Sequence, residues 1–311
     1  MALMPGLTPD TPWSHEINPM NTLRGLFRLV RPVFLMEGIL LYALGTGIAR
    51  YLGVLLHLDL YLLGQLWVTA VQVGALSLRA YFNLAQEADR AGSVNSPRPT
   101  YLFVLLIAVT FFTTAASITV SLLAGGHTSP VVFTLMLLIF LAAVFYSAPP
   151  LRLEYSGYGD LVVSVVLVVL VPAFSYILQG GESLRLIAMS TFPLVCLRLA
   201  WMLLSEFPVY ADNLINNRGT MLVRMGWERG MLLFNLLNLI AFILLALATA
   251  FGMSFAIAAP GFLLLPLGGW QIVMMSRVAA GAKPQWRSSI LAASALYGAL
   301  AYLLMFGFWI R

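Results

Sequence analysis

The sequence predicts an all-α membrane protein with about nine transmembrane helices, and three observations support this prediction. Of the 311 residues, 61% are hydrophobic and only 9% are charged, whereas a soluble domain carries about 25% charged residues. Apolar stretches of about 18 residues or more recur, and each is long enough to cross a bilayer core of about 30 Å. Glycine and proline punctuate the intervals between the stretches. These observations exclude a water-soluble globular domain.

The predicted spans are bounded by polar residues, glycine or proline. In chain order they cover residues 32–52, 60–82, 100–123, 130–148, 159–179, 185–205, 230–251, 254–276 and 288–309. Pairs such as Gly125–Gly126 and Pro149–Pro150 mark the turns. The seventh and eighth spans are the least clearly separated, because almost no polar residue divides them. Residues 1–22 are polar and proline-rich and lack the apolar core of a signal peptide, so residues 23–311 are expected to form a single transmembrane domain.

The basic residues predict which helix ends face the cytoplasm, because cytoplasmic loops carry an excess of Lys and Arg. With the N-terminus in the cytoplasm, thirteen of the 17 basic residues fall on the cytoplasmic side, and Arg50, Arg185 and Arg311 fall outside. We therefore expect a multi-pass protein of the cell membrane. The basic residues are spread over several loops, so nucleic acid is not an expected partner.

Polar side chains gather in three loops that this topology places in the cytoplasm, at about residues 79–99, 147–160 and 206–229. These loops hold seven of the twelve acidic residues, namely Glu87, Asp89, Glu154, Asp160, Glu206, Asp212 and Glu228. Burying polar groups in a membrane costs several kcal/mol unless they are paired or line a cavity. One cytoplasm-facing site is therefore expected.

The loop at 79–99 has the composition of a metal and pyrophosphate site. Asn83 and Glu87 are four residues apart and share a helix face, with Asp89 close by. Carboxylate and amide oxygens suit Mg²⁺, and Arg90 and Arg98 suit a pyrophosphate. The alternative is a solvated loop whose charges flank the membrane.

The loop at 206–229 repeats this composition with one carboxylate, three amides, a phenol and two guanidinium groups. They belong to Asp212, Asn213, Asn216, Asn217, Tyr210, Arg218 and Arg224. The loop at 79–99 follows the second predicted span, and the loop at 206–229 follows the sixth. This spacing of four spans indicates an internal duplication. Two such loops on one face are what a two-sided clamp around a metal and a pyrophosphate requires.

The loop at 147–160 lies in the segment YSAPPLRLEYSGYGDLVV, residues Tyr146–Val163. It contains a Pro–Pro turn followed by Gly159–Asp160 at the start of the next helix. Asp160 there is explained as a cap or as a partner of the helix dipole.

This segment closely resembles the corresponding segment of the UbiA-type intramembrane prenyltransferases, especially the 1,4-dihydroxy-2-naphthoate polyprenyltransferase branch of menaquinone synthesis. The resemblance extends to FRLVRPVFL (Phe27–Leu35) and FPVYADNLINNRGTMLVRMG (Phe207–Gly226), and it covers nearly the whole chain. The Asp-rich motifs are eroded: the second motif, Asp-x-x-x-Asp, falls on Val209 and Asn213, with Asp212 one residue away. The first motif falls on Arg79, Ala80, Asn83 and Glu87 in one alignment, or starts at Asn83 in another.

The resemblance implies transfer of a polyprenyl group from a prenyl diphosphate to an aromatic acceptor, with Mg²⁺ as cofactor, in menaquinone or related isoprenoid biosynthesis. The implied metal ligands are Glu87, Asp89, Asp212, Asn213 and Asn216. The implied diphosphate contacts are Asn83, Arg90, Arg98, Arg218 and Arg224. The implied catalytic residues are Glu87, Tyr146, Tyr210 and Asp212. Because carboxylates are lost, metal recruitment is expected to be weaker than in the family.

Alternatives remain open. The erosion of the acidic motifs also fits a terpene cyclase or a non-catalytic lipid-binding relative, and the tyrosines also fit interfacial anchors. Glu37 and Arg198 are charged residues within predicted spans, which makes them either functional groups or a structural pair. Gln72 either lines a cavity or bonds a neighbouring helix.

Overall fold

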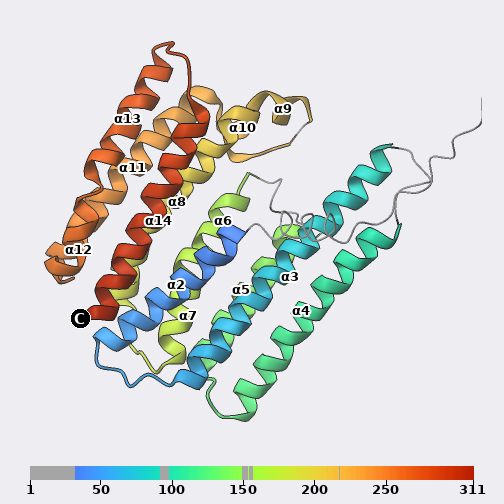
Figure 1. The fold of residues 1–311 in the computed structure, drawn as a ribbon, viewed down its shortest axis with the longest axis vertical. Coiled ribbons are helices and arrows are strands. Elements are labelled where there is room, and N and C mark those ends of the chain that lie inside the picture. Colours follow the sequence, from blue (N-terminus) through green and yellow to red (C-terminus); the bar gives the residue numbers. More distant parts are fainter. Residues whose placement is uncertain (1–31, 92–97, 149–152, 154–156, 217) are drawn as a thin grey trace, which may run out of the picture.

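The protein is described by a computed structural model, which covers residues 32–91, 98–148, 153, 157–216 and 218–311. Over these residues it is a bundle of helices without strands (Figure 1). The longer helices are α2 (Pro32–Tyr51), α3 (Leu58–Ala91), α4 (Arg98–Ala124), α5 (Pro130–Ser147), α8 (Arg185–Glu206), α11 (Trp227–Ala250), α13 (Leu265–Ala279) and α14 (Trp286–Ile310). The shorter helices are α6 (Gly159–Val165), α7 (Val171–Leu178), α9 (Tyr210–Ile215), α10 (Met221–Met225) and α12 (Phe255–Phe262).

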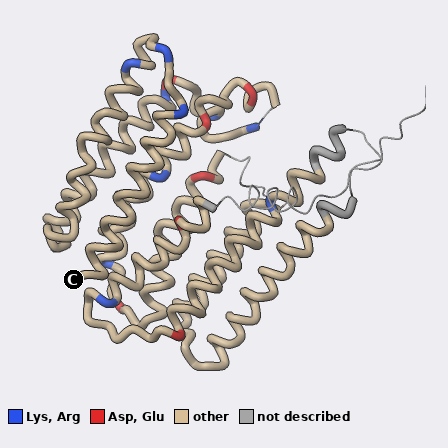
Figure 2. The backbone as a smooth tube through the Cα atoms, viewed as in Figure 1, with Lys and Arg blue, Asp and Glu red and all other residues tan. Residues whose placement is uncertain are grey.

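The described helices confirm the predicted all-α membrane architecture. Eight are long and apolar enough to cross a membrane, and the number rises to nine if the bent pair α12 and α13 counts as one span. Charged residues lie mainly towards the two ends of the bundle (Figure 2). We call the end that carries α9, α10 and the C-terminus of α3 the polar end. That this end faces the cytoplasm stays a prediction.

Helix α3 is longer than the predicted span at 60–82, and it includes residues that were predicted to belong to the first polar loop. Its 34 residues exceed the roughly 20 that cross a bilayer. The last turns run through LAQEADRA, which is rich in good helix formers. Residues 79–91, predicted as loop, therefore continue the helix, and α4 already begins at Arg98.

Two other predicted spans are interrupted at prolines. The span at 159–179 consists of α6, a π-helical turn at Val166–Leu170, and α7, whose second residue is Pro172. Proline has no backbone N–H and clashes with the preceding turn, so the regular hydrogen-bond ladder cannot continue through it. The span at 254–276 is bent by 40° between α12 and α13, where Pro260 and Pro266 flank the break.

Close helix packing depends on small residues at two contacts of α2 and α3. A Cβ atom on Gly45 would lie 2.1 Å from the carbonyl oxygen of Pro172, and one on Gly64 would lie 2.1 Å from the Tyr42 hydroxyl. Small residues let membrane helices approach closely enough for van der Waals packing to hold them together. These contacts fix α2 against both α7 and α3.

A buried charged cluster joins α2, α6, α8 and α14 within the bundle. The Arg198 guanidinium donates through Nε and Nη2 to the two carboxylate oxygens of Glu37. Its Nη1 donates to Ser164 Oγ at 2.8 Å, and the Tyr297 hydroxyl donates to Glu37 Oε1 at 2.6 Å. Arg198 is completely buried and Glu37 is 7% exposed. Glu37 and Arg198 were expected to be either functional groups or a structural pair, and the structure shows that they form an ion pair.

Candidate functional site

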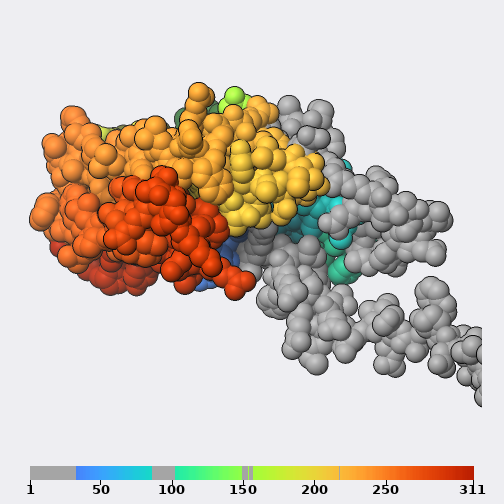
Figure 3. All heavy atoms as spheres, turned by 90° about the horizontal axis from the view of Figure 1, so that it is seen from above, coloured from blue at the N-terminus to red at the C-terminus, as the bar shows by residue number. Residues whose placement is uncertain are grey.

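A cavity of about 390 Å³ lies at the polar end between α2, α3, α5, α6, α8 and the segment that follows α8. Its polar lining residues are Gln72, Arg79, Tyr146, Asp160, Ser205, Glu206, Asn213, Arg218 and Thr220. Its apolar lining includes Phe34, Val68, Val71, Ile139, Leu167 and Met202. The cavity therefore combines charges of both signs with an apolar wall. Figure 3 shows the bundle from above, with the yellow and orange segments around α9 and α10 next to red-orange residues near the start of α14.

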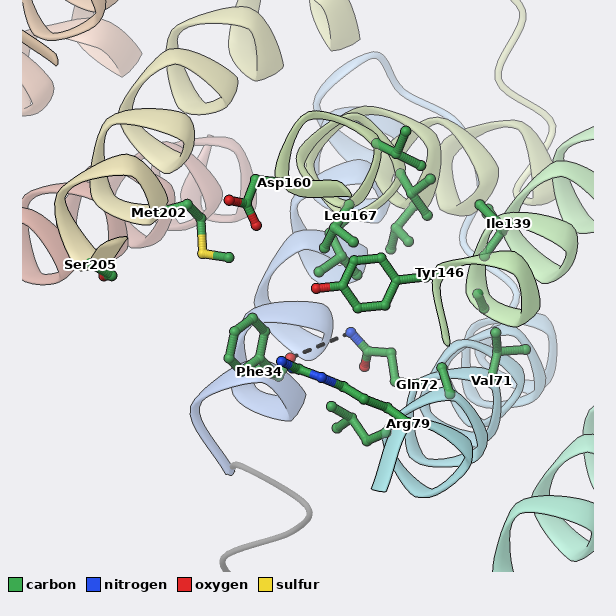
Figure 4. A pocket seen from close by; sticks show the side chains of 18 of the residues that line it. Phe34, Val71, Gln72, Arg79, Ile139, Tyr146, Asp160, Leu167, Met202 and Ser205 are labelled. Carbon is green, nitrogen blue, oxygen red and sulfur yellow. Dashed lines mark hydrogen bonds between the residues drawn. The ribbon is translucent and has the colours of Figure 1, made fainter. Parts of the chain in front are cut away.

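One side of the cavity is built by α3 and α5. Gln72 and Arg79 are seven residues apart on α3, so they share one helix face, and both point into the cavity (Figure 4). The Arg79 guanidinium lies over the Tyr146 ring at 5.9 Å, a cation–π contact that orients both side chains. Gln72 Nε2 donates to the carbonyl oxygen of Phe34 at 3.4 Å. Gln72 therefore fulfils both alternatives, since it lines the cavity and bonds a neighbouring helix.

The acidic part of the cavity wall comes from α6 and α8. Asp160 lies in the first turn of α6 and Glu206 is the last residue of α8. Both residues line the cavity. Glu206 Oε2 accepts the backbone N–H of Leu222 at 2.8 Å, and Ser164 Oγ donates to the carbonyl oxygen of Asp160 at 2.6 Å. The pair is thus anchored to α10 and, through Ser164, to the buried Arg198.

Among the predicted site residues whose side chains the structure describes, Tyr146, Asn213 and Arg218 line this cavity. Asn213 is 6% exposed, whereas Asp212 and Asn216 are exposed and are absent from the lining. Successive residues of a helix point about 100° apart, so Asp212 and Asn213 face different sides of α9. Asn216 Nδ2 donates to the carbonyl oxygen of Asp212 at 2.8 Å. That Asp212 and Asn216 bind a metal stays a prediction, and the composition of the cavity lining gives it no support.

Tyr210 and Arg224 make packing contacts outside the cavity lining. The Tyr210 ring packs against that of Trp227 at a centroid distance of 5.6 Å. The Arg224 guanidinium lies over the Tyr158 ring at 5.5 Å, and its Nε donates to the carbonyl oxygen of Gly219 at 3.2 Å. Gly157 has a φ of 78°, and a Cβ atom there would lie 2.6 Å from Arg224 Cδ. Arg224 therefore joins the segment before α6 to the segment before α10.

The remaining predicted residues belong to the ends of α3 and α4. Asn83 lies one turn beyond Arg79 and is absent from the lining. The backbones of Glu87, Asp89 and Arg90 extend α3, and Arg98 begins α4, but the side chains of these four residues lie outside the described part of the chain.

Sequence reasoning missed the cavity roles of Arg79, Asp160, Glu206 and Thr220. In the sequence, Arg79 is one position of the first motif in one alignment, and its spacing of seven from Gln72 is the signal that both share a helix face. Asp160 was explained locally as a helix cap. Glu206 ends an apolar span, and its spacing of four from Met202 places both on one face of α8.

The chain matches no protein-family model and no curated protein. Its fold is similar to that of a UbiA homolog from Archaeoglobus fulgidus. The structure of that homolog bound to DMAPP and Mg²⁺ matches with a TM-score of 0.60 and 17% identity, over 90% of this chain and 98% of that chain. The structure bound to GPP and Mg²⁺ matches with a TM-score of 0.57 and 16% identity, over 90% of this chain and 99% of that chain. The likeness confirms that the described helices adopt the fold of this UbiA homolog.

Proposed function

We propose that the protein is an integral-membrane transferase that moves a prenyl group from a prenyl diphosphate to an aromatic acceptor. The observation that supports this most strongly is the composition of the cavity, in which Arg79 and Arg218, a carboxyl pair and an apolar wall face one space at the polar end of a UbiA fold. The Archaeoglobus fulgidus homolog has been solved with the prenyl diphosphates GPP and DMAPP.

The two arginines bind the diphosphate. Guanidinium groups form paired, charge-assisted hydrogen bonds with phosphate oxygens, and Arg79 is held in place by its contact with the Tyr146 ring. The apolar side chains between α3 and α6, such as Val71 and Leu167, hold the prenyl chain. They also exclude water, which would otherwise capture a reactive allylic carbon.

In the transfer step, the bond between the allylic carbon and the diphosphate oxygen breaks, and its electron pair leaves on the diphosphate. Arg79 and Arg218 stabilise the negative charge that develops there. The allylic carbon forms a bond to a ring carbon of the acceptor, which then loses a proton. Tyr146 points into the middle of the cavity (Figure 4), where it positions the acceptor or stabilises the allylic cation.

The oxygen donors of the cavity fit a magnesium ion. Mg²⁺ is usually held by one or two carboxylates together with substrate phosphates, and the wall offers Asp160 and Glu206 with the Asn213 amide. The described residues contain no group of three or more His, Cys, Asp or Glu that could hold a metal, so the substrate has to complete the coordination. When bound, Mg²⁺ neutralises charge on the departing diphosphate.

The class of acceptor follows from the resemblance of Tyr146–Val163 to the menaquinone branch. We infer a dihydroxynaphthoate-like acceptor, reached from the cytoplasmic side of the cell membrane, and a product in menaquinone or related quinone biosynthesis. A phenolic ring suits the reaction, because hydroxyl groups raise the electron density of the ring carbon that attacks.

An assay of the purified protein tests this proposal. A labelled polyprenyl diphosphate, Mg²⁺ and a panel of aromatic acceptors are expected to give a prenylated aromatic product and one equivalent of inorganic diphosphate, both lost on chelation of the metal. The absence of both products with every acceptor would reject the proposal. A cyclised hydrocarbon formed without an acceptor would support the terpene cyclase alternative instead.

A further inference from the structure

We propose that the side chain of Gln271 binds a water molecule in a second, smaller cavity, which lies between α8, α11, α13 and α14. This cavity measures about 10 Å³, and its lining includes the polar residues Gln271, Gln285 and Ser289 and the apolar residues Leu204, Phe234 and Met275. Leu204 of α8 lines this cavity, whereas Met202 and Ser205 of the same helix line the large one. Helix α8 therefore separates the two cavities, and the second site does not depend on the proposed transfer reaction.

The amide of Gln271 is buried without a protein partner. Gln271 lies on α13, in the second half of the bent span, and is 3% exposed. Neither its Oε1 nor its Nε2 forms a hydrogen bond with the described residues. A buried polar group that is left unsatisfied costs free energy, and the large majority of such groups bond either to protein or to ordered water. Both atoms of this amide are therefore expected to bind a further molecule.

A buried amide on the neighbouring helix α11 shows how Gln271 differs. Asn238 Nδ2 donates to the carbonyl oxygen of Phe234 at 2.9 Å, one turn earlier in the same helix. Short polar side chains often bond in this way to their own backbone, and Asn238 is thereby satisfied on its donor side, although its Oδ1 has no partner among the described residues. Gln271 makes no bond to its own helix and instead lines the cavity. Its amide is available to a molecule in that space.

The size and the chemistry of the cavity both select water. A cavity needs about 10–15 Å³ to hold one water molecule, and this one, at about 10 Å³, is too small for a lipid headgroup. Gln271 presents one acceptor oxygen and an NH₂ donor group, and water is able to bond to either. A buried water typically makes about three hydrogen bonds, and the side chains of Gln285 and Ser289 lie on the same lining. The described lining contains no carboxylate, imidazole or thiol, so a metal ion is not the expected occupant.

The bound water links α13 to the start of α14. Gln285 is the N-cap residue of α14 and Ser289 belongs to its first turn, whereas Gln271 lies in the middle of α13. Because α12 and α13 form a bent pair, α13 lacks the support that a continuous helix would give it. Polar side chains hold membrane helices together through hydrogen bonds, and here a water molecule supplies the bridge that the side chains do not form directly.

X-ray footprinting of the purified full chain in detergent micelles tests the inference. Radiation converts water into hydroxyl radicals, and a bound water therefore oxidises a methionine beside it to the sulfoxide. Met275 lines the cavity and is 4% exposed, whereas Met136 and Met253 belong to the apolar core and are each 2% exposed. We expect Met275 to be oxidised several-fold faster than Met136 and Met253, as measured by mass spectrometry of each peptide. Equal rates at the three methionines would overturn the inference.

Two variants show whether the Gln271 amide holds the water. Gln271→Leu removes the amide, and because apolar cavities stay dry, oxidation of Met275 is expected to fall to the rate of Met136. Asn238→Leu is the matched control, since it removes a buried amide that is absent from the lining, and it is expected to keep the wild-type rate at Met275. An unchanged rate in folded Gln271→Leu, or an equal fall in Asn238→Leu, would also overturn the inference. The comparison of methionines within the wild type keeps the test decisive if Gln271→Leu does not fold.

Discussion

Replacing Arg198 with methionine is expected to destabilise the protein by about 3–5 kcal/mol, because the substitution leaves the Glu37 carboxylate buried without its partner. Glu37 would keep one hydrogen bond, from the Tyr297 hydroxyl, which cannot compensate for the loss of the guanidinium. Ser164 Oγ would also lose its donor from α8. Unfolding in mixed detergent micelles with increasing denaturant measures the change in free energy.

The double variant Glu37→Met/Arg198→Met provides the control. Replacing both members of a buried ion pair with apolar groups is often neutral or stabilising, so the double variant is expected to recover most of the lost stability. If the single Arg198→Met variant unfolded at the denaturant concentration of the wild type, the pair would have no role in holding the four helices together.

Arg79→Ala is expected to lower kcat/KM for the prenyl diphosphate by about 10²-fold or more, the effect of removing one preorganised donor from a developing anion. Arg79→Lys retains the charge but loses the planar group that stacks on Tyr146 and binds phosphate through two hydrogen bonds. An intermediate loss is therefore expected for the lysine variant. Steady-state kinetics with a saturating acceptor measure both.

Arg287→Ala is the matched control, since Arg287 is exposed near the start of α14 and is absent from the cavity lining. Its kcat/KM is expected to equal that of the wild type. Equal losses in the Arg79 and Arg287 variants would show that only the net charge matters, and this would contradict a specific diphosphate contact at Arg79.

The membrane class and most of the spans were predictable, because apolar length dominates the sequence of a membrane helix. The interruptions were less predictable. Pro172 is visible in the sequence, but whether a proline kinks, widens or ends a helix depends on the helices packed against it. The bend between α12 and α13 falls in a stretch where no polar residue marks a boundary. The extension of α3 beyond the bilayer was hidden because its polar residues resemble those of a loop.

Residues of the candidate site were predicted from the sequence only where they belong to a segment with a recognisable motif. Tyr146, Asn213 and Arg218 were found because they lie in segments with a recognisable motif. Asp160 and Glu206 were missed because each has a local explanation, and only the fold brings α6 and α8 together. Asp212 was the most prominent acid of its loop, but the side of α9 that faces the cavity is set by packing. Composition alone does not reveal that orientation.

Occupation of the cavity by a prenyl diphosphate is measured most directly by thermal unfolding of the purified protein with Mg²⁺ and GPP, because a ligand that binds only the folded state raises its unfolding temperature. We expect Mg²⁺ and GPP together to raise this temperature more than either alone, and we expect the increase to be lost in Arg79→Ala and retained in Arg287→Ala. An unchanged unfolding temperature, or an equal increase in the Arg79→Ala variant, would contradict a prenyl diphosphate site in this cavity.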